Sequence, residues 1–453
     1  MAKASEKAED HLKAVKAELQ KDSFNDEAAH ERLTSLKALA RDPQNASCVY
    51  CAQGLGVLAE VAFGSNNDQR PFSSLEAARV VANALLLQDQ MQQVLADLCC
   101  QNRVLDFYSQ QSADHEFVGA RILFLLTYKS KVDFVELIES QGLVDHIRAH
   151  LAKHASLTSS DDFATSPMKT MALTETTKLL YNLTSKYPGQ MYFLSQTVES
   201  LISVARDIAL PSGPLGPPLA QILNALAILE WPVSLNKGRE DSMLDLAHRS
   251  IELLDQSTSS LQPVQLETML IALLTTTRKL IELSYMKVQQ LLRLSLLPQD
   301  EERDKPLGQS RSLASRVLRL HTSGGLTILP EAISGLLFDL SNRDARTFVH
   351  NIGYGHAAGY LMTHKIPMPQ DLITTANENI GEVEINPITG QRVDAETPVS
   401  IPEMTDAEKE REAERLFVLF ERLKATGVMN VENPLRSAQQ SGRFEELSDS
   451  EPD

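Results

Sequence analysis

The segment ILNALAILEWP, residues 222–232, decides the fold class, because its apolar residues recur at the three- and four-residue intervals of an α-helix. Five other segments share this pattern and also end in turn-forming or charged residues: VVANALLLQD (80–89), ILFLLTYKS (122–130), LLYNLTSKYP (179–188), IALLTTTRKL (271–280) and LLFDLSNRDA (336–345). Alternating strand patterns are nearly absent from the chain. The sequence therefore predicts an all-α protein.

The six segments also define a repeat. Alignment gives each segment one residue at a shared position: Asn83, Leu125, Asn182, Asn224, Leu273 and Asp339, with spacings of 42, 57, 42, 49 and 66 residues. A period of about 40 to 47 residues is typical of armadillo and HEAT repeats, which stack helices into a solenoid. Two polar, proline-bearing stretches, 154–169 and 296–310, explain the longest spacings if they form loops. We expect residues 1–370 to form an armadillo/HEAT-like α-solenoid.

The remaining residues have a different character. Residues 371–403 are acidic and contain prolines, which indicates a linker, and residues 427–453 are predicted to be an acidic disordered tail. Between them, residues 404–426 predict one amphipathic helix, with Thr405 and Glu408 as a capping box. Its apolar stripe consists of Leu416, Phe417, Leu419, Phe420 and Leu423.

The overall charge excludes some classes of partner. The net charge is −17, and residues 371–453 alone carry 19 acidic and 8 basic residues. Such a balance argues against binding to nucleic acid or to anionic lipid surfaces. No apolar run approaches the roughly 18 residues of a membrane span, and neither terminus carries a secretion or lipidation signal. We expect a cytoplasmic, monomeric protein without an integral membrane segment.

Two patterns that resemble ligand sites fail on their context. Cys48 and Cys51 form a C-x-x-C pair, but the adjacent Cys99 and Cys100 lack the spacer that lets two thiolates reach one zinc ion. The glycines of NIGYGHAAGYL (351–361) resemble a dinucleotide fingerprint, but the stretch before them is helical instead of a strand. We expect Gly353 to end one helix in a left-handed conformation, and we expect no metal, no cofactor and no enzymatic activity.

Three asparagines at the repeat position are candidates for partner binding. Asparagine is a poor helix former that needs a hydrogen-bond partner, so Asn83, Asn182 and Asn224 either line a concave groove or cap carbonyls in the core.

Two pairs of basic residues are further candidates for partner binding. Lys37 and Arg41 share one helical face, as do Arg316 and Arg319. Each pair is either solvated surface or an anchor for a carboxylate.

The order of several motifs resembles the synembryn family, whose members are cytosolic chaperones and nucleotide-exchange factors for G-protein α subunits. The glycine-rich loop at 351–361 is followed by INPITG (385–390) and then by MTDAEKEREAERLFVLFERL (404–423). Further similarity lies in LKALARD, RILFLLT, LLYNLT, LLPQ and SRVLRLHT, so the resemblance covers nearly the whole chain. No single motif is specific, but the ordered set is.

The resemblance implies that the concave face of the solenoid binds the C-terminal helix of a GDP-bound or nucleotide-free α subunit. Lys37, Arg41 and Asn83 match family positions near the terminal carboxylate of that helix, although the family commonly has arginine where this chain has Lys37. Arg316 and Arg319 match a basic helix near the other end of the groove. The amphipathic helix with Phe417 and Phe420 is expected to dock on the solenoid or on the partner's switch region.

The acidic tail contains two candidate phosphorylation sites. Ser448 and Ser450 each precede an acid by three residues, so an acidophilic kinase is a further expected partner, unless the tail only solubilises the protein.

One alternative function remains: the chain could be a generic armadillo adaptor that binds an extended peptide without promoting nucleotide exchange. Groove tryptophans would favour the adaptor, but Trp231 is the only tryptophan of the chain. If the resemblance holds, the α-subunit partner also recruits the protein to the plasma membrane.

Overall fold

The computed structural model describes residues 2–65, 70–157, 166–209, 213, 215–236, 238–283, 285–367, 385, 386 and 388–396, together with eight residues between 405 and 418. Nearly all regular structure in this described part is helical, with one isolated antiparallel bridge between Ile385 and Arg392. The chain divides into two compact units, Met1–Ala395 and Glu396–Asp453. The prediction of an all-α fold is confirmed.

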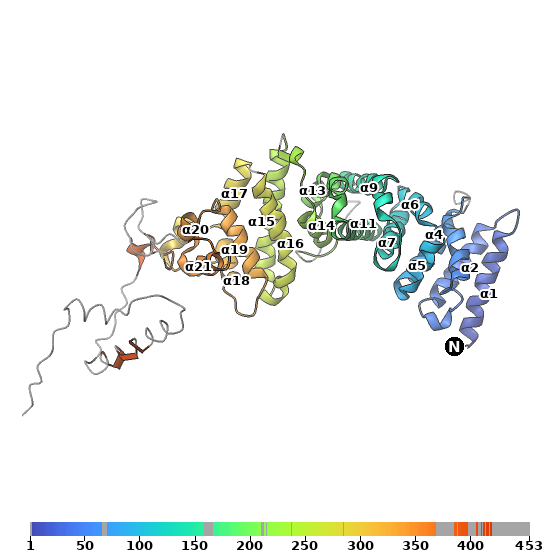
Figure 1. Cartoon of the computed structure of the whole chain (residues 1–453), viewed down its shortest axis with the longest axis horizontal. Helices are drawn as coiled ribbons and strands as arrows, with labels where there is room; N and C mark the ends of the chain where they lie inside the picture. Colours follow the sequence, from blue (N-terminus) through green and yellow to red (C-terminus); the bar gives the residue numbers. More distant parts are fainter. Residues whose placement is uncertain are drawn as a thin grey trace, which may run out of the picture. The chain divides into compact units, whose positions relative to one another are not determined.

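The first unit consists of two rows of helices in sequence order (Figure 1). The first row contains α2 (Asp26–Leu39), α4 (Pro71–Leu87), α7 (Ala113–Lys129), α11 (Pro167–Lys186), α14 (Leu219–Ile228), α16 (Pro263–Glu282) and α19 (Leu329–Leu340). Each helix of this row packs on the next. The six residues of the aligned repeat position lie on the six helices from α4 to α19. The repeat in the sequence therefore corresponds to one first-row helix per unit.

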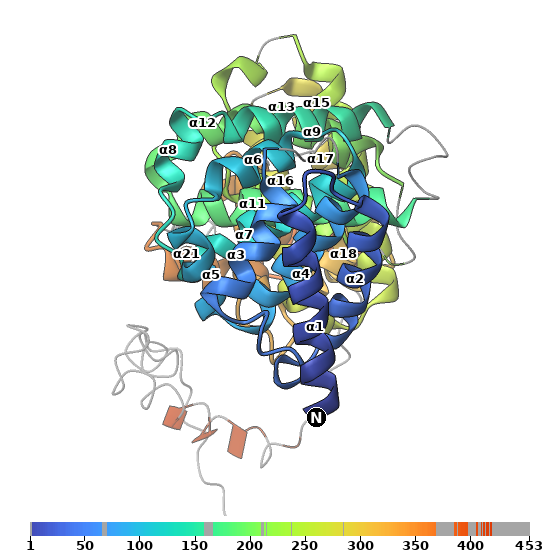
Figure 2. The ribbon, with the colours of Figure 1, turned by 90° about the vertical axis from the view of Figure 1, so that its right-hand side faces the viewer.

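The second row covers one side of the first. It contains α1 (Ala2–Leu19), α3 (Ala52–Phe63), α6 (Gln101–Ser109), α9 (Leu143–Leu157), α13 (Val198–Asp207), α15 (Glu240–Ser260), α17 (Met286–Leu296) and α18 (Leu313–His321). Figure 2 shows α1 beside α2, with α4 behind them. Three short helices join the rows: α5 (Gln90–Asp97), α8 (Phe134–Glu139) and α12 (Met191–Leu194). The apolar side chains between the rows form one continuous core.

Glycine closes the last helical pair of the solenoid, as the sequence predicts. Gly353, with φ of 79°, ends α20 (Ala345–Ile352) and precedes α21 (Tyr354–Thr363). A Cβ at Gly353 would lie 3.2 Å from the carbonyl oxygen of Ile388 and from the amide of Gly390. The amide of Gly355 donates a hydrogen bond to that Ile388 carbonyl at 3.2 Å. The glycines therefore let residues 388–390 pack against the start of α21.

The expectation that residues 296–310 form a polar loop outside the solenoid is wrong. This stretch contains a 3₁₀ helix, η6 (Asp300–Asp304), whose Arg303 is only 3% exposed. The Arg303 guanidinium donates to the carbonyls of His350, Asn351 and Gly390 at 3.0 to 3.2 Å. Three backbone acceptors offset the cost of burying this charge, and composition alone does not reveal them. Of the other expected loop, residues 158–165 lie outside the described residues.

Candidate partner-binding face

The exposed side of α7 presents five side chains in one line, because they are spaced three and four residues apart: Asp114, Phe117, Arg121, Phe124 and Tyr128. On α4, Phe72, Arg79 and Leu86 also share one side, because they lie seven residues, or about two helical turns, apart. On α11, Met171, Lys178 and Tyr181 do so at intervals of seven and three residues. We call this side of α4, α7 and α11, together with Lys37 of α2 and Lys186 of α11, the basic face. It combines cations with exposed or half-buried apolar side chains.

A buried carboxylate organises the end of this face at α2 and α4. Glu76 is 2% exposed, forms an ion pair with Lys37, and accepts from Arg79 at 3.0 Å. Burial alone would raise the pKa of Glu76, but the hydrogen bonds from Lys37 and Arg79 outweigh burial and lower it. Arg79 also donates to Asp114 of α7 at 2.6 Å. The two cations here are therefore matched by two carboxylates.

The α7–α11 pair carries an excess of positive charge. Lys178 lies 3.0 Å from the buried carboxylate of Glu175, and Arg121 reaches the same carboxylate at 3.9 Å. Lys186 lies 4.4 Å over the ring of Tyr128 and donates to the carbonyl of Thr127. Burial and the neighbouring Lys129 lower the pKa of Lys186. One carboxylate therefore faces several cations, and this is the part of the basic face most attractive to an anion.

A third cluster lies between α16 and α19. Asp339 is 5% exposed and accepts from Arg278 at 2.6 Å and from Arg343 at 2.7 Å. Arg343 also approaches the exposed Glu282 at 3.4 Å. The charges of this cluster are balanced, as they are around Glu76. Between the two ends of the row, α14 carries the polar Gln221 and Asn224 on its exposed side.

The prediction that Lys37 and Arg41 share one face of a helix holds only for Lys37. Lys37 lies on α2, but that helix ends at Leu39, so Arg41 lies beyond it and is exposed. The physical reason is Pro43, which restricts the preceding Asp42 to an extended conformation with φ of −117° and ψ of 114°. Lys37 belongs to the basic face, whereas Arg41 has no hydrogen bond or ion pair within the described chain.

The three predicted asparagines lie in different environments. Asn182 is 9% exposed, and its amide donates to the hydroxyl of Thr127 on the neighbouring α7 at 2.9 Å. Asn83 is half-buried on α4 and Asn224 is exposed on α14. Asn182 therefore serves a contact between two helices, whereas Asn83 and Asn224 are accessible on the exposed side of the first row.

Arg316 and Arg319 are engaged within the protein. Arg316 forms an ion pair with Asp255 of α15 and donates to the hydroxyl of Thr258 at 3.1 Å. Arg319 donates to the carbonyls of Gly308 and Ser310 at 2.8 and 2.7 Å. The structure thus uses both guanidinium groups to hold α18 against α15 and against the preceding loop. Neither belongs to the basic face.

The predictions for the C-terminal unit are mostly untested. The described residues between 409 and 418 are helical, and Phe417 is half-buried. Phe420, Ser448 and Ser450 lie outside the described residues.

Sequence reasoning missed Arg79, Arg121 and Lys178, although a signal for them was present. Each lies four residues before the aligned position of its own repeat, which is Asn83, Leu125 and Asn182, respectively. A cation recurring one helical turn before the aligned position in three consecutive repeats predicts a basic stripe.

Other kinds of site are not found in the described part of the chain. No group of three or more His, Cys, Asp or Glu side chains there could hold a metal ion. None of the described helices is long and apolar enough to span a bilayer.

Comparison with known proteins shows which family and which relatives this chain matches. Residues 32–443 match the family model described as guanine nucleotide exchange factor synembryn. A synembryn-like chaperone of Schizosaccharomyces pombe is 31% identical over 173 residues, which cover 35% of this chain and 33% of that protein. Chaperone Ric-8A of Xenopus laevis is 24% identical over 397 residues, covering 78% of this chain and 71% of that protein. The chain thus spans a third of the yeast relative it matches.

Among solved structures, two engineered proteins match at 15% identity. Their TM-scores are 0.38 and 0.37, and the matches cover 60% and 81% of this chain and 97% and 95% of theirs. The family match, in contrast, extends over most of the sequence. This chain therefore belongs to the synembryn family of guanine nucleotide exchange factors.

Proposed function

We propose that this protein is a chaperone and exchange factor for G-protein α subunits and that it acts without covalent chemistry. The basic face carries this proposal, because the α7–α11 pair combines the unbalanced cations Arg121, Lys178 and Lys186 with the apolar Tyr128 and Tyr181. An amphipathic helix that ends in a carboxylate is complementary to such a surface. The C-terminal helix of an α subunit is the corresponding ligand.

The exchange mechanism follows from thermodynamic linkage. A face that binds the terminal helix after it has left the nucleotide domain binds the nucleotide-free α subunit more tightly than the GDP-bound form. By reciprocity, the bound protein promotes GDP release, and GTP binding then releases the protein. A coupling of about 4 to 5.5 kcal/mol corresponds to a change in affinity of roughly a thousand- to ten-thousand-fold. Stabilisation of the incompletely folded subunit follows from the same preference.

The C-terminal unit is proposed to provide a second contact. The helix that carries Phe417 and Phe420 would meet the switch region of the partner, and phosphorylation of Ser448 and Ser450 by an acidophilic kinase would regulate binding. The protein would act as a monomer in the cytoplasm and reach the plasma membrane through its partner.

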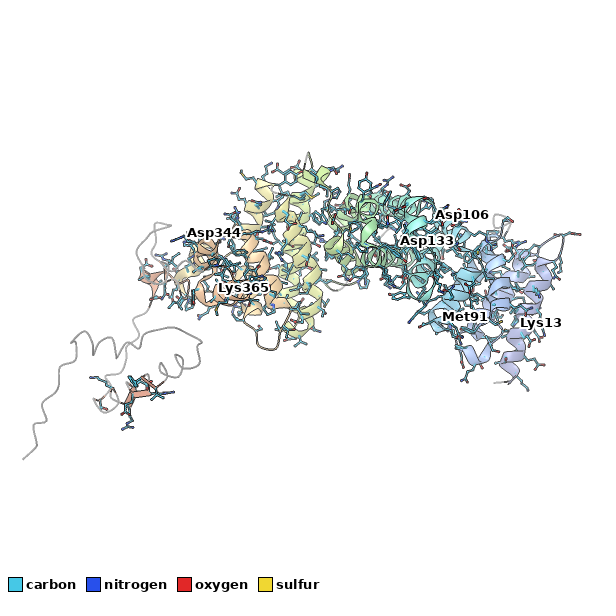
Figure 3. The ribbon with its side chains drawn as sticks, viewed as in Figure 1. Lys13, Met91, Asp106, Asp133, Asp344 and Lys365 are labelled. Carbon is cyan, nitrogen blue, oxygen red and sulfur yellow. The ribbon has the colours of Figure 1, made fainter. Side chains whose placement is uncertain are left out.

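The test is the rate of GDP release from purified α subunits of several classes, with and without this protein. In the double variant Arg121→Gln/Lys186→Gln, the buried Glu175 keeps Lys178 as its partner, so the fold is preserved. We expect at least a tenfold loss of affinity, because charged hydrogen bonds contribute about 1.5–3 kcal/mol each. The matched control is Lys13→Gln/Lys287→Gln, which removes the same charge from α1 and α17 of the second row; Figure 3 labels Lys13.

Each outcome has a defined meaning. Accelerated GDP release that the double variant loses and the control retains supports the proposal. Binding without any effect on GDP release would support the adaptor instead. Absence of binding to every α subunit would contradict the proposal.

A further inference from the structure

A pocket of about 530 Å³ lies beside α12, α13 and the loop that follows α14, and none of its lining residues belongs to the basic face. Its walls come from Tyr192 of α12, from Ser195 and Glu199, and from Glu230 and Trp231 in the loop after α14. Tyr192 is 79% exposed at the rim, which is unusual for a large aromatic side chain. The proposed exchange mechanism does not use this pocket.

The wall of the pocket contains a ring that is held in place from within the protein. The indole N–H of Trp231 donates to the carbonyl of Leu226 at 3.0 Å, which fixes the ring. Ser195 also lines the pocket, but it is 8% exposed and its hydroxyl oxygen is inaccessible. The pocket therefore offers a fixed aromatic wall.

The rim carries negative charge. Glu199 forms an ion pair with Arg239 at 2.5 Å, and both side chains are about half exposed. The exposed carboxylate of Glu230 has no hydrogen bond or ion pair within the described chain. The nearby Arg148 is engaged by Asp145 and by the side chain of Gln196 at about 3 Å. The rim therefore has one carboxylate in a weak surface pair and one without a partner.

We propose that this pocket binds the guanidinium group of an arginine side chain presented by a partner protein. A guanidinium is planar, so it can stack on the rings of Trp231 and Tyr192. Its fork of N–H donors can pair with both oxygens of the Glu230 carboxylate. An anionic group would be repelled by Glu199 and Glu230. A lysine ammonium would satisfy the carboxylate but would lack the planar fork.

The position of the only tryptophan makes the test specific. Because Trp231 is the single tryptophan of the chain, tryptophan fluorescence of the whole protein reports on this pocket alone. The probe is the capped tripeptide Ala-Arg-Ala, titrated into the full-length protein at low salt. The control peptide replaces arginine with citrulline, which keeps the shape and removes the charge. We expect a saturable change in Trp231 emission with the arginine peptide and at least tenfold weaker binding of the citrulline peptide.

Three variants complete the experiment. We expect Glu230→Gln to weaken binding of the arginine peptide several-fold. Ser195→Ala should leave the binding unchanged, because the Ser195 hydroxyl is inaccessible. Arg239→Gln should strengthen binding, because it frees Glu199 from its internal ion pair. Equal binding of the two peptides, no change in emission, or no effect of Glu230→Gln would overturn the proposal. The double variant Arg121→Gln/Lys186→Gln should leave this binding unchanged, so the result is independent of the proposed exchange function.

Discussion

The guanidinium of Arg278 lies over the backbone of Gly335, where no other residue would leave room for it. A Cβ at Gly335 would come within 2.9 Å of Nη1 of Arg278. Arg278 extends from α16 to pair with Asp339 of α19, and Gly335 lies one helical turn before that aspartate. A glycine inside a helix costs about 1 kcal/mol relative to alanine, so its place here is explained by the arginine that crosses it.

We predict that Gly335→Ala displaces Arg278 without unfolding the protein. The gain in helix propensity of about 1 kcal/mol offsets the weakened contact with Asp339, so the free energy of unfolding should change by less than about 1 kcal/mol. Urea unfolding measures the stability, and the NMR signal of the Arg278 Nε–H reports the loss of its bond to Asp339. Gly359→Ala is the control, because a Cβ there meets no atom within 4 Å. Destabilisation of more than about 2 kcal/mol would show that Arg278 cannot move aside.

A buried carboxylate on α7 predicts an acid-sensitive part of the core. Glu116 is 2% exposed and accepts from His154 at 2.9 and 3.0 Å and from the hydroxyl of Thr176 at 2.9 Å. Burial alone would raise the pKa of Glu116, but hydrogen bonds from His150 and His154 outweigh burial and lower it to about 2. Glu116 therefore stabilises the fold as a carboxylate.

We predict that Glu116→Gln lowers the free energy of unfolding by about 3 kcal/mol at pH 7, with the size set by the depressed pKa. A lowered folded-state pKa means that this stabilisation is fully present above about pH 4.5 and is lost as the pH falls towards about 2. The difference between wild type and variant should therefore shrink below pH 4.5. Urea unfolding between pH 7 and pH 3.5 measures it. A difference that stays constant over this range would show that Glu116 is not the titrating group.

Sequence periodicity was sufficient to predict six helices of the first row and their order, because each of them buries its own apolar stripe. Periodicity could not predict which charged side chains form internal ion pairs, because their partners lie on other helices. Arg121 meets Glu175 from α11, and Arg316 meets Asp255 from α15. A basic pair such as Arg316 and Arg319 is therefore indistinguishable in sequence from an exposed pair until the neighbouring helix is in place.

The environments of the asparagines also depend on neighbouring helices that periodicity does not reveal. Asn83, Asn182 and Asn224 share one repeat position, yet only Asn182 finds a hydroxyl on the helix before it, because α7 places Thr127 there. The residue on the neighbouring helix decides whether the amide faces a core partner or solvent.

We predict different consequences for two of these asparagines. Asn182→Ala should lower the free energy of unfolding by about 1 kcal/mol, because it removes a buried hydrogen bond to Thr127. Asn224→Ala should change it by less than about 0.5 kcal/mol, because that side chain is exposed. Thermal unfolding of both variants measures the contrast. Equal losses of stability would contradict the assignment of Asn182 to a contact between helices.

The contacts of Arg303 predict how residues 388–395 are held on the solenoid. Its buried guanidinium joins Gly390 to the end of α20, and Gln391 donates to the carbonyl of Asp304 at 3.0 Å from the other direction. Arg303→Met keeps most of the volume but leaves three carbonyls without their donor. We expect a loss of about 3 kcal/mol in local stability. Faster hydrogen exchange at the Gly355 amide, which donates to Ile388, is the readout.

The control for this experiment is Arg392→Gln, which removes a cation from the same segment. Arg392 lies at the surface and pairs with Asp394 at 2.5 Å, and an exposed pair of this kind contributes little. We therefore expect Gly355 to exchange at the wild-type rate in this variant and much faster in Arg303→Met. If both variants exchanged like wild type, backbone hydrogen bonds such as Leu307 to Thr389 at 3.2 Å would suffice to hold the segment. The burial of Arg303 would then need another explanation.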